Sequence, residues 1–280
     1  MTSGDVVAGC LLALGGAVLS YAVCSKRVKA QPRELMRTNY RGRPVAAVLG
    51  DGVVAAGAIG IAAAAVLARA DATTVPIGRL APAAAVVVAV MYLAGLWDDH
   101  KGDERPRGFK GHISAARGRM VTGGVVKLMA GAAAGTAAGF LVADGIGPIA
   151  VTAALVALSA NLVNLFDRAP GRASKVALSA AVPLAVWGPP EWWIVGAGAF
   201  GGVVGSLPLD LGEKGTLGDA GANAVGAFVG LGLAVTLGPF GCWIAAVVLA
   251  ALNVASERWS FSRIIESNRA LDFLDRIGRK

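Results

Sequence analysis

The chain has 280 residues, of which 55% are hydrophobic and only 16% are charged. Soluble domains usually carry about a quarter charged residues, so this composition excludes an ordinary soluble protein and indicates an integral membrane protein. The formal net charge of +8 does not indicate nucleic-acid binding, because basic loops beside an anionic membrane leaflet account for it.

Apolar runs follow one another along the chain, and each is long enough to cross the hydrocarbon core of a bilayer. They are rich in Ala and Gly, small residues that let membrane helices approach one another closely. We therefore predict an all-α fold, a polytopic transmembrane helix bundle of about nine spans. The expected spans are 5–24, 46–69, 79–97, 121–143, 146–165, 173–189, 191–208, 219–237 and 239–256.

The distribution of Lys and Arg predicts an outside N-terminus and a cytosolic C-terminus, because basic residues accumulate in cytosolic loops. In that orientation every Lys and Arg except Arg69 and Arg79 falls on the inner side of a cytoplasmic (inner) cell membrane. We expect a multi-pass domain and a cytosolic tail. The domain is 1–256, its cytosolic loops are 25–45, 98–120, 166–175 and 209–219, and the tail is 257–280.

Acidic residues stand where several of these spans meet the cytosol. Asp98 and Asp99 end the third span, Asp167 ends the fifth, and Asp219 opens the eighth. Each could be only a solvated helix cap, and a carboxylate at a helix N-terminus is favoured by the helix dipole. Two adjacent charges such as Asp98 and Asp99, however, call for a cation or wide solvation. A helix bundle could bring all four carboxylates together at one depth.

These residue types favour a site for a metal ion and a diphosphate. Carboxylate oxygens suit Mg²⁺, which takes one or two carboxylates together with substrate phosphates. Arginine and lysine side chains could bind the phosphate oxygens. The basic candidates are Lys101, Arg117, Arg119, Lys127, Arg168 and Arg172. Such a set is typical of phosphoryl transfer, in which positioning and charge neutralisation supply most of the catalysis.

Four motifs occur in order along most of the chain. They are RTNYRGRP at 37–44, the aspartate pair at 98–99, N-x-x-N-x-x-D at 161–167 and G-D-x-G at 218–221. Together they resemble the polyprenyl-phosphate N-acetylhexosamine-1-phosphate transferases, which include the phospho-N-acetylmuramoyl-pentapeptide translocases. The resemblance implies Mg²⁺-dependent transfer of a sugar-1-phosphate from a nucleotide sugar, a UDP-N-acetylhexosamine, to a polyprenyl phosphate, with Mn²⁺ as an alternative ion. The products are a polyprenyl-diphosphate-sugar and UMP, in an initiating step of a cell-envelope polymer.

The resemblance also implies roles for individual residues. Asp219 is expected as the main metal ligand with Asp98 beside it, and Asp98, Asp99 and Asp167 are expected as catalytic residues. Substrate contacts are expected from Asn161, Asn164, Arg168, Arg172, Arg119, Lys127, Arg43, Glu257 and Arg258. The implied partners are the nucleotide sugar, the polyprenyl phosphate and the lipid bilayer, and relatives suggest a homodimer.

The sequence departs from the family pattern after the fifth span. Where relatives carry D-G-x-D-G, this chain has Asp167 followed by Arg-Ala-Pro-Gly, and Pro170 replaces the second aspartate. We therefore expect recognition of the donor to differ from that in relatives. Two other functions stay open: a secondary transporter, which predicts discontinuous helices with charges near the membrane midplane, and a catalytically inactive membrane scaffold of the same family.

The tail has the pattern of an interfacial amphipathic helix, with a plain C-terminal anchor as the simpler interpretation. Its apolar residues recur at helical spacing while arginines fill the other positions. The apolar residues are Ile264, Ile265, Leu271, Leu274 and Ile277. Glu257 and Arg258, at the start of the tail, are expected near the sugar.

Overall fold

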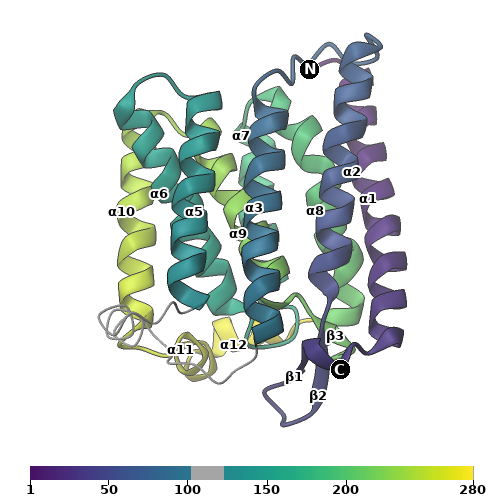
Figure 1. Ribbon diagram of the computed structural model, residues 1–280, viewed down its shortest axis with the longest axis vertical. Helices are drawn as coiled ribbons and strands as arrows, with labels where there is room; N and C mark the ends of the chain where they lie inside the picture. Colours follow the sequence, from purple (N-terminus) through teal and green to yellow (C-terminus); the bar gives the residue numbers. More distant parts are fainter. Residues whose placement is uncertain (102–122, 280) are drawn as a thin grey trace.

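The computed structural model describes residues 1–101 and 123–279, and most of them are helical, which confirms an all-α membrane bundle (Figure 1). The long helices are α1 (Ser3–Ala30), α2 (Leu49–Arg69), α3 (Leu80–Lys101), α5 (Gly123–Val142), α6 (Ile146–Phe166), α7 (Arg172–Trp187), α8 (Pro190–Leu211), α9 (Gly218–Thr236) and α10 (Pro239–Ser256). Among the described residues, seven helices are long and apolar enough to cross a membrane. The 16-residue α7 is too short for that measure, so nine spans and their orientation stay a prediction.

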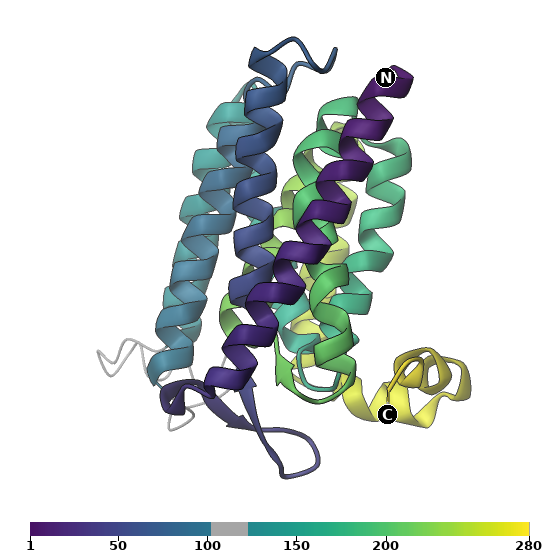
Figure 2. The same ribbon diagram turned by 90° about the vertical axis from the view of Figure 1, so that its right-hand side faces the viewer.

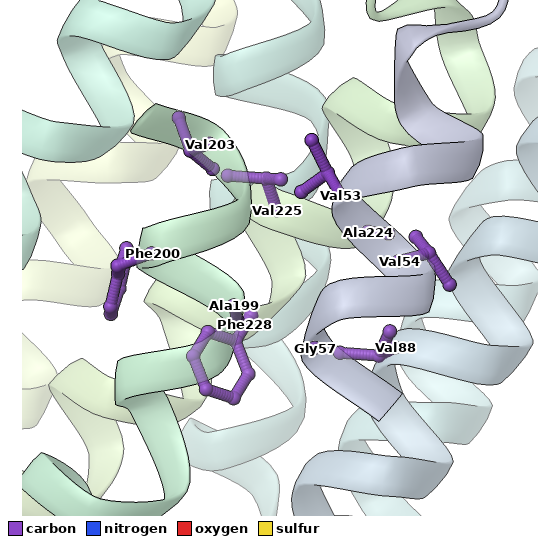
Figure 3. Close-up of a pocket in the computed structure, with 10 residues that line it drawn as sticks. All are labelled: Val53, Val54, Gly57, Val88, Ala199, Phe200, Val203, Ala224, Val225 and Phe228. Atoms are coloured by element: carbon purple, nitrogen blue, oxygen red, sulfur yellow. The ribbon is translucent and has the colours of Figure 1, made fainter. Parts of the chain in front are cut away.

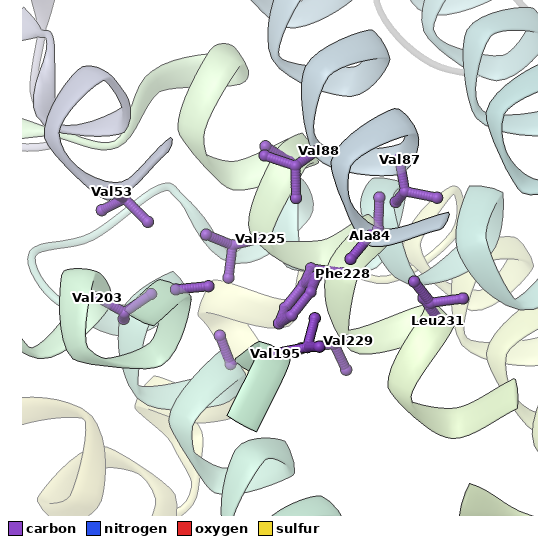
Figure 4. Close-up of a cluster of buried hydrophobic side chains, with 14 of the residues drawn as sticks. Val53, Ala84, Val87, Val88, Val195, Val203, Val225, Phe228, Val229 and Leu231 are labelled. Carbon is purple, nitrogen blue, oxygen red and sulfur yellow. The ribbon is translucent and has the colours of Figure 1, made fainter. Parts of the chain in front are cut away.

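Helix α9 is the centre of the bundle and is buried along most of its length. It packs against α3 and α6, and more lightly against α2 and α7. Its Phe228 stacks on Trp192 with ring centroids 4.6 Å apart and also touches Phe200. Figure 4 shows Phe228 surrounded by valine and leucine side chains from the neighbouring helices. The position of α9 is therefore fixed by close packing on several sides.

A small apolar pocket lies between α2, α3, α8 and α9 (Figure 3). Valine, alanine, glycine and phenylalanine residues line it, among them Val53, Val88, Phe200 and Phe228. No charged or polar side chain lines it. It therefore offers contacts to an apolar group only.

Glycines let α8 pack closely against α1. A Cβ atom on Gly201 or Gly205 would overlap the carbonyl oxygens of Ala13 and Ala17. Small residues are common at such contacts between membrane helices. The hydrophobic effect does not drive helices together in lipid, so close van der Waals packing takes its place. The abundance of Gly in the sequence thus has a direct packing role.

The two ends of the bundle differ in chemistry. At the end that carries the N-terminus, the buried Asp5 accepts hydrogen bonds from Thr73 and Thr74 in the connection between α2 and α3. The opposite end, which we call the sheet end, carries a three-stranded sheet and the tail (Figures 1 and 2). The strands are β1 (Met36–Thr38), β2 (Pro44–Ala47) and β3 (Gly215–Thr216), with β1–β2 antiparallel and β2–β3 parallel.

We expect Gly201→Ala to lower the free energy of unfolding by about 1–3 kcal/mol, because the added methyl group overlaps backbone atoms of α1. Gly15→Ala on α1 is the matched control, since its Cβ would meet no atom within 4 Å. Both changes raise helix propensity equally, so the difference between them isolates packing. Thermal unfolding in detergent measures it, and equal stability of the two variants would contradict the close α1–α8 contact.

Candidate functional site

The first turn of α9 forms the core of the site. Gly218 has a φ of +69°, and a Cβ atom there would lie 2.9 Å from Cβ of Ala47 and 3.0 Å from Oδ2 of Asp99. Only glycine combines that backbone conformation with so close an approach. The glycine of the G-D-x-G motif therefore lets α9 begin directly against β2 and α3, with Asp219 as the next residue.

Two of the predicted carboxylates hold the N-terminus of α9. Asp99, which is only 4% exposed, accepts hydrogen bonds from the backbone N–H groups of Asp219 (3.2 Å) and Ala220 (2.9 Å). Asp167 accepts from the backbone N–H of Gly218 and the hydroxyl of Thr216, both at 2.9 Å. The first N–H groups of a helix have no partner within the helix, and carboxylates stabilise them well. The contacts of Asp99 and Asp167 thus fix the position of Asp219.

The other two carboxylates share one ammonium group. Nζ of Lys127 lies 2.7 Å from Oδ2 of Asp98 and 2.8 Å from Oδ2 of Asp219. The side chains of Lys127, Asp98 and Asp219 are 15%, 19% and 30% exposed. Asn164 also lies against the carboxylate of Asp219. Helices α3, α5, α6 and α9 therefore meet at a point where a single cation balances two acids.

This geometry fits a divalent cation held by two carboxylates. Within the part of the chain that the structure describes, no three His, Cys, Asp or Glu side chains converge on one point. Asp99 and Asp167 are occupied by backbone N–H groups, whereas Asp98 and Asp219 already face a positive charge. Mg²⁺ commonly takes one or two carboxylates and completes its shell with water and phosphate oxygens. Asp98 and Asp219 are thus the residues able to hold it.

The basic first loop reaches the site through Arg37. One guanidinium nitrogen of Arg37 donates to the main-chain oxygen of Asp99 and lies 3.9 Å from its Oδ1 atom. Arg43, the residue predicted from this loop, is exposed beside the β1–β2 turn, and its backbone exchanges hydrogen bonds with Asn39. Arg37 is thus the arginine of this loop that contacts Asp99 in the structure, and a substrate contact of Arg43 stays a prediction.

A carboxylate of α8 that lies against the turn between α6 and α7 was missed by sequence reasoning. Asp210, 2% exposed near the end of α8, accepts a hydrogen bond from the hydroxyl of Ser174 (3.3 Å) and one from the backbone of Gly171. Burial raises the pKa of Asp167 well above its usual range, and the charge of Asp210 raises it further. Asp210 ends an apolar run just as Asp98 does, so the same reasoning could have found it.

Arg172 is bound by the tail. Its Nε and Nη2 atoms each donate to the carboxylate of Asp275 at 2.8 Å, and its Nη1 donates to the hydroxyl of Ser262 at 2.7 Å. Arg279 lies 2.6 Å from the same carboxylate and donates to the carbonyl of Pro170 at 3.0 Å. The guanidinium of Arg172 is thus turned toward the tail, and Arg279 of the tail binds the Pro-Gly turn.

The remaining predicted contacts are dispersed. Asn161 donates to Asn253 of α10 at 2.5 Å, which joins α6 to α10. Arg168 is exposed on the α6–α7 turn, and Glu257 and Arg258 are exposed at the end of α10. Arg119 lies outside the described residues. Of the predicted substrate contacts that the structure describes, only Lys127 and Asn164 are therefore placed beside the carboxylate of Asp219.

The chain matches no protein-family model, no curated protein and no solved structure. The resemblance carried by the four sequence motifs thus stays a prediction, and a proposed function rests on those motifs together with the arrangement of the site.

We expect Lys127→Met to destabilise the protein by about 3 kcal/mol, because Asp98 and Asp219 would face each other without a counter-charge. Millimolar Mg²⁺ should restore much of that loss, since a ligand that binds only the folded state stabilises it. Thermal unfolding with and without Mg²⁺ measures both effects. A Lys127→Met protein that responds to Mg²⁺ no more than the native protein would rule out a cation site at this pair.

The ion pair between Asp275 and Arg172 predicts that the stability of the protein depends on pH. Burial opposes ionisation of Asp275, but hydrogen bonds and charge from Arg172, together with Arg279, outweigh it and lower the pKa of Asp275 below 3.8. The stabilisation is then complete above pH 3.8 and is lost as the pH falls through the lower, folded-state pKa. The difference in melting temperature between native protein and Asp275→Asn should follow this course, and a difference that grows on acidification would contradict it.

Proposed function

We propose that the protein transfers a sugar-1-phosphate from a nucleotide sugar to a polyprenyl phosphate at the sheet end of the bundle, in a reaction that depends on Mg²⁺. The donor is a UDP-N-acetylhexosamine, and the products are UMP and a polyprenyl-diphosphate-sugar that initiates a cell-envelope polymer. The sheet end is the cytosolic side in this proposal, and the membrane is the cytoplasmic one.

The observation that carries the proposal is the pairing of Asp98 and Asp219 around Lys127 at one end of an apolar bundle. Two carboxylates fixed 2.7 and 2.8 Å from one cation form a polar centre where helices meet the membrane surface. A lipid-linked phosphate and a water-soluble nucleotide could both reach such a place. The four sequence motifs supply the choice of reaction class.

Asp219 and Asp98 would hold the metal ion, which supplies neutralisation of phosphate charge and a template for the two substrates. Asp99 and Asp167 act as positioning residues, because they bind the N–H groups at the start of α9. The same contacts leave these N–H groups unavailable to phosphate. The negative charge of the diphosphate therefore has to be met by side-chain cations and the metal ion rather than by the helix N-terminus.

Lys127 is the cation best placed to contact phosphate. With a divalent ion held by Asp98 and Asp219, the ammonium group of Lys127 would be free to pair with a phosphate oxygen. Arg168, exposed on the adjacent turn, is a second cation available to the donor. These two residues would place the β-phosphate of the nucleotide sugar beside the lipid phosphate.

The chemical step needs no strong base. A phosphate monoester has a second pKa of about 6, so the attacking oxygen of the polyprenyl phosphate is already largely ionised near neutral pH. That oxygen forms a bond to the β-phosphorus of the donor, and the bond from this phosphorus to the bridging oxygen breaks. UMP leaves with the bridging oxygen, and the sugar-phosphate stays on the lipid.

The test incubates purified protein with polyprenyl phosphate, Mg²⁺ and a panel of nucleotide sugars, and follows release of nucleoside monophosphate. Asp98→Asn and Asp219→Asn should each lower the rate by about 100-fold or more, because several kcal/mol of charge stabilisation depends on the metal ion.

Asp144→Asn is the matched control, since Asp144 is fully exposed and pairs only loosely with Arg79, 4.0 Å away, at the other end of the bundle. It should keep the native rate. A fully active Asp219→Asn protein would refute the proposed site, and absence of release with every donor would favour a transporter or an inactive scaffold.

A further inference from the structure

The tail helices have an unusual orientation on the protein. They are α11 (Phe261–Ser267) and α12 (Arg269–Arg276). At 100° per residue, Phe273 and Leu274 fall on one side of α12, roughly opposite Asp275, and Ile277 follows directly after the helix. Asp275 is 7% exposed in its contact with Arg172, whereas Phe273, Leu274 and Ile277 are 68%, 56% and 49% exposed.

The docking of α12 is the reverse of the usual arrangement. A helix on a water-soluble protein normally buries its apolar side and exposes its charges. Here an ion pair faces the protein and the apolar side faces away from it. Such a surface is stable when something apolar covers it.

We propose that the apolar side of α12 binds the surface of the anionic membrane leaflet at the sheet end, with its side chains in the boundary between headgroups and acyl chains. Figures 1 and 2 show α11 and α12 lying crosswise at the ends of the bundle helices, and Figure 2 shows them extending to one side of the bundle. This is the place and direction of a helix that lies in the membrane interface.

The tail is continuous with a surface that already faces lipid. Val254 on α10 is 70% exposed, and Trp259, in the link to α11, is 59% exposed. Tryptophan is enriched where a membrane-spanning segment reaches the headgroups. The apolar surface of α10 therefore passes directly into the proposed interfacial surface.

Charge selects an anionic leaflet. The exposed charged residues of the tail include Arg258, Arg263 and Arg269, against Glu257 and Glu266, while Arg276 is paired with Asp272 at 2.8 Å. Each basic residue near an anionic surface adds about 1 kcal/mol of attraction. Arg269 lies one turn before Phe273 on the same side of α12, so a cation accompanies the apolar side chains toward lipid.

The polar contact of the tail gives this binding a consequence inside the protein. Through Asp275 and Arg172 the tail joins the membrane surface to the turn that begins three residues after Asn164. Lipid binding and the position of the turn are thus linked by one buried ion pair. The inference does not depend on the reaction proposed above.

The experiment uses the full chain in lipid nanodiscs, with Cys10, Cys24 and Cys242 replaced by alanine. A nitroxide is attached at Leu274→Cys on the apolar side, and at Arg276→Cys, about 160° away around the same helix, as the control. Collision with oxygen, which concentrates in lipid, is compared with collision with a water-soluble nickel chelate. Elution as a single folded species establishes that each labelled protein is intact.

In discs that contain phosphatidylglycerol, the oxygen-to-nickel ratio at position 274 should exceed that at 276 severalfold. It should fall toward the ratio at 276 in discs of phosphatidylcholine alone. Equal ratios in the anionic discs would overturn the proposal by placing the helix in water. A label at 274 that is shielded from both reagents would also overturn it, because protein, such as a second copy of the chain, would then cover the surface.

Discussion

The structure depends on the neutralisation of acidic groups at one end of an apolar bundle. Four carboxylates there have defined partners: Lys127 pairs with Asp98 and Asp219, and backbone N–H groups of α9 donate to Asp99 and Asp167. Buried charges without partners are costly, so these contacts fix how α3, α5, α6 and α9 meet. The packing of these helices in turn prevents the charged groups from moving apart. Stability and the geometry of the site therefore have the same origin.

Close backbone packing makes this arrangement sterically feasible. A Cβ atom on Gly50 would lie 2.5 Å from the backbone nitrogen of Gly221, and one on Gly95 would overlap the carbonyl of Asp219. These glycines bring α2 and α3 against the first turn of α9. The parallel pairing of Ala46 with Gly215 then connects the first loop to the same point. The basic first loop, the aspartate pair and the G-D-x-G motif are far apart in the sequence but belong to one packed unit.

The sequence predicts the helices well, because the length of an apolar run is a local property. It also predicts that Asp98, Asp99, Asp167 and Asp219 gather at one end, because the basic loops indicate which ends of the spans lie together. It does not predict which of Asp98 and Asp99 faces the cation, since neighbours on a helix point about 100° apart and the rotation of α3 is set by packing. The sequence also does not predict that Arg172 pairs with Asp275, because the two residues are 103 positions apart in the chain.

Asp98 and Asp219 form the proposed cation site, and Lys127 neutralises both carboxylates when no metal ion is bound. Titration with Mn²⁺, followed by electron paramagnetic resonance, tests this most directly. We predict that the native protein binds a single Mn²⁺ ion per chain and that this binding is lost in the Asp98→Asn/Asp219→Asn double variant. Unchanged Mn²⁺ binding in the double variant would contradict the account.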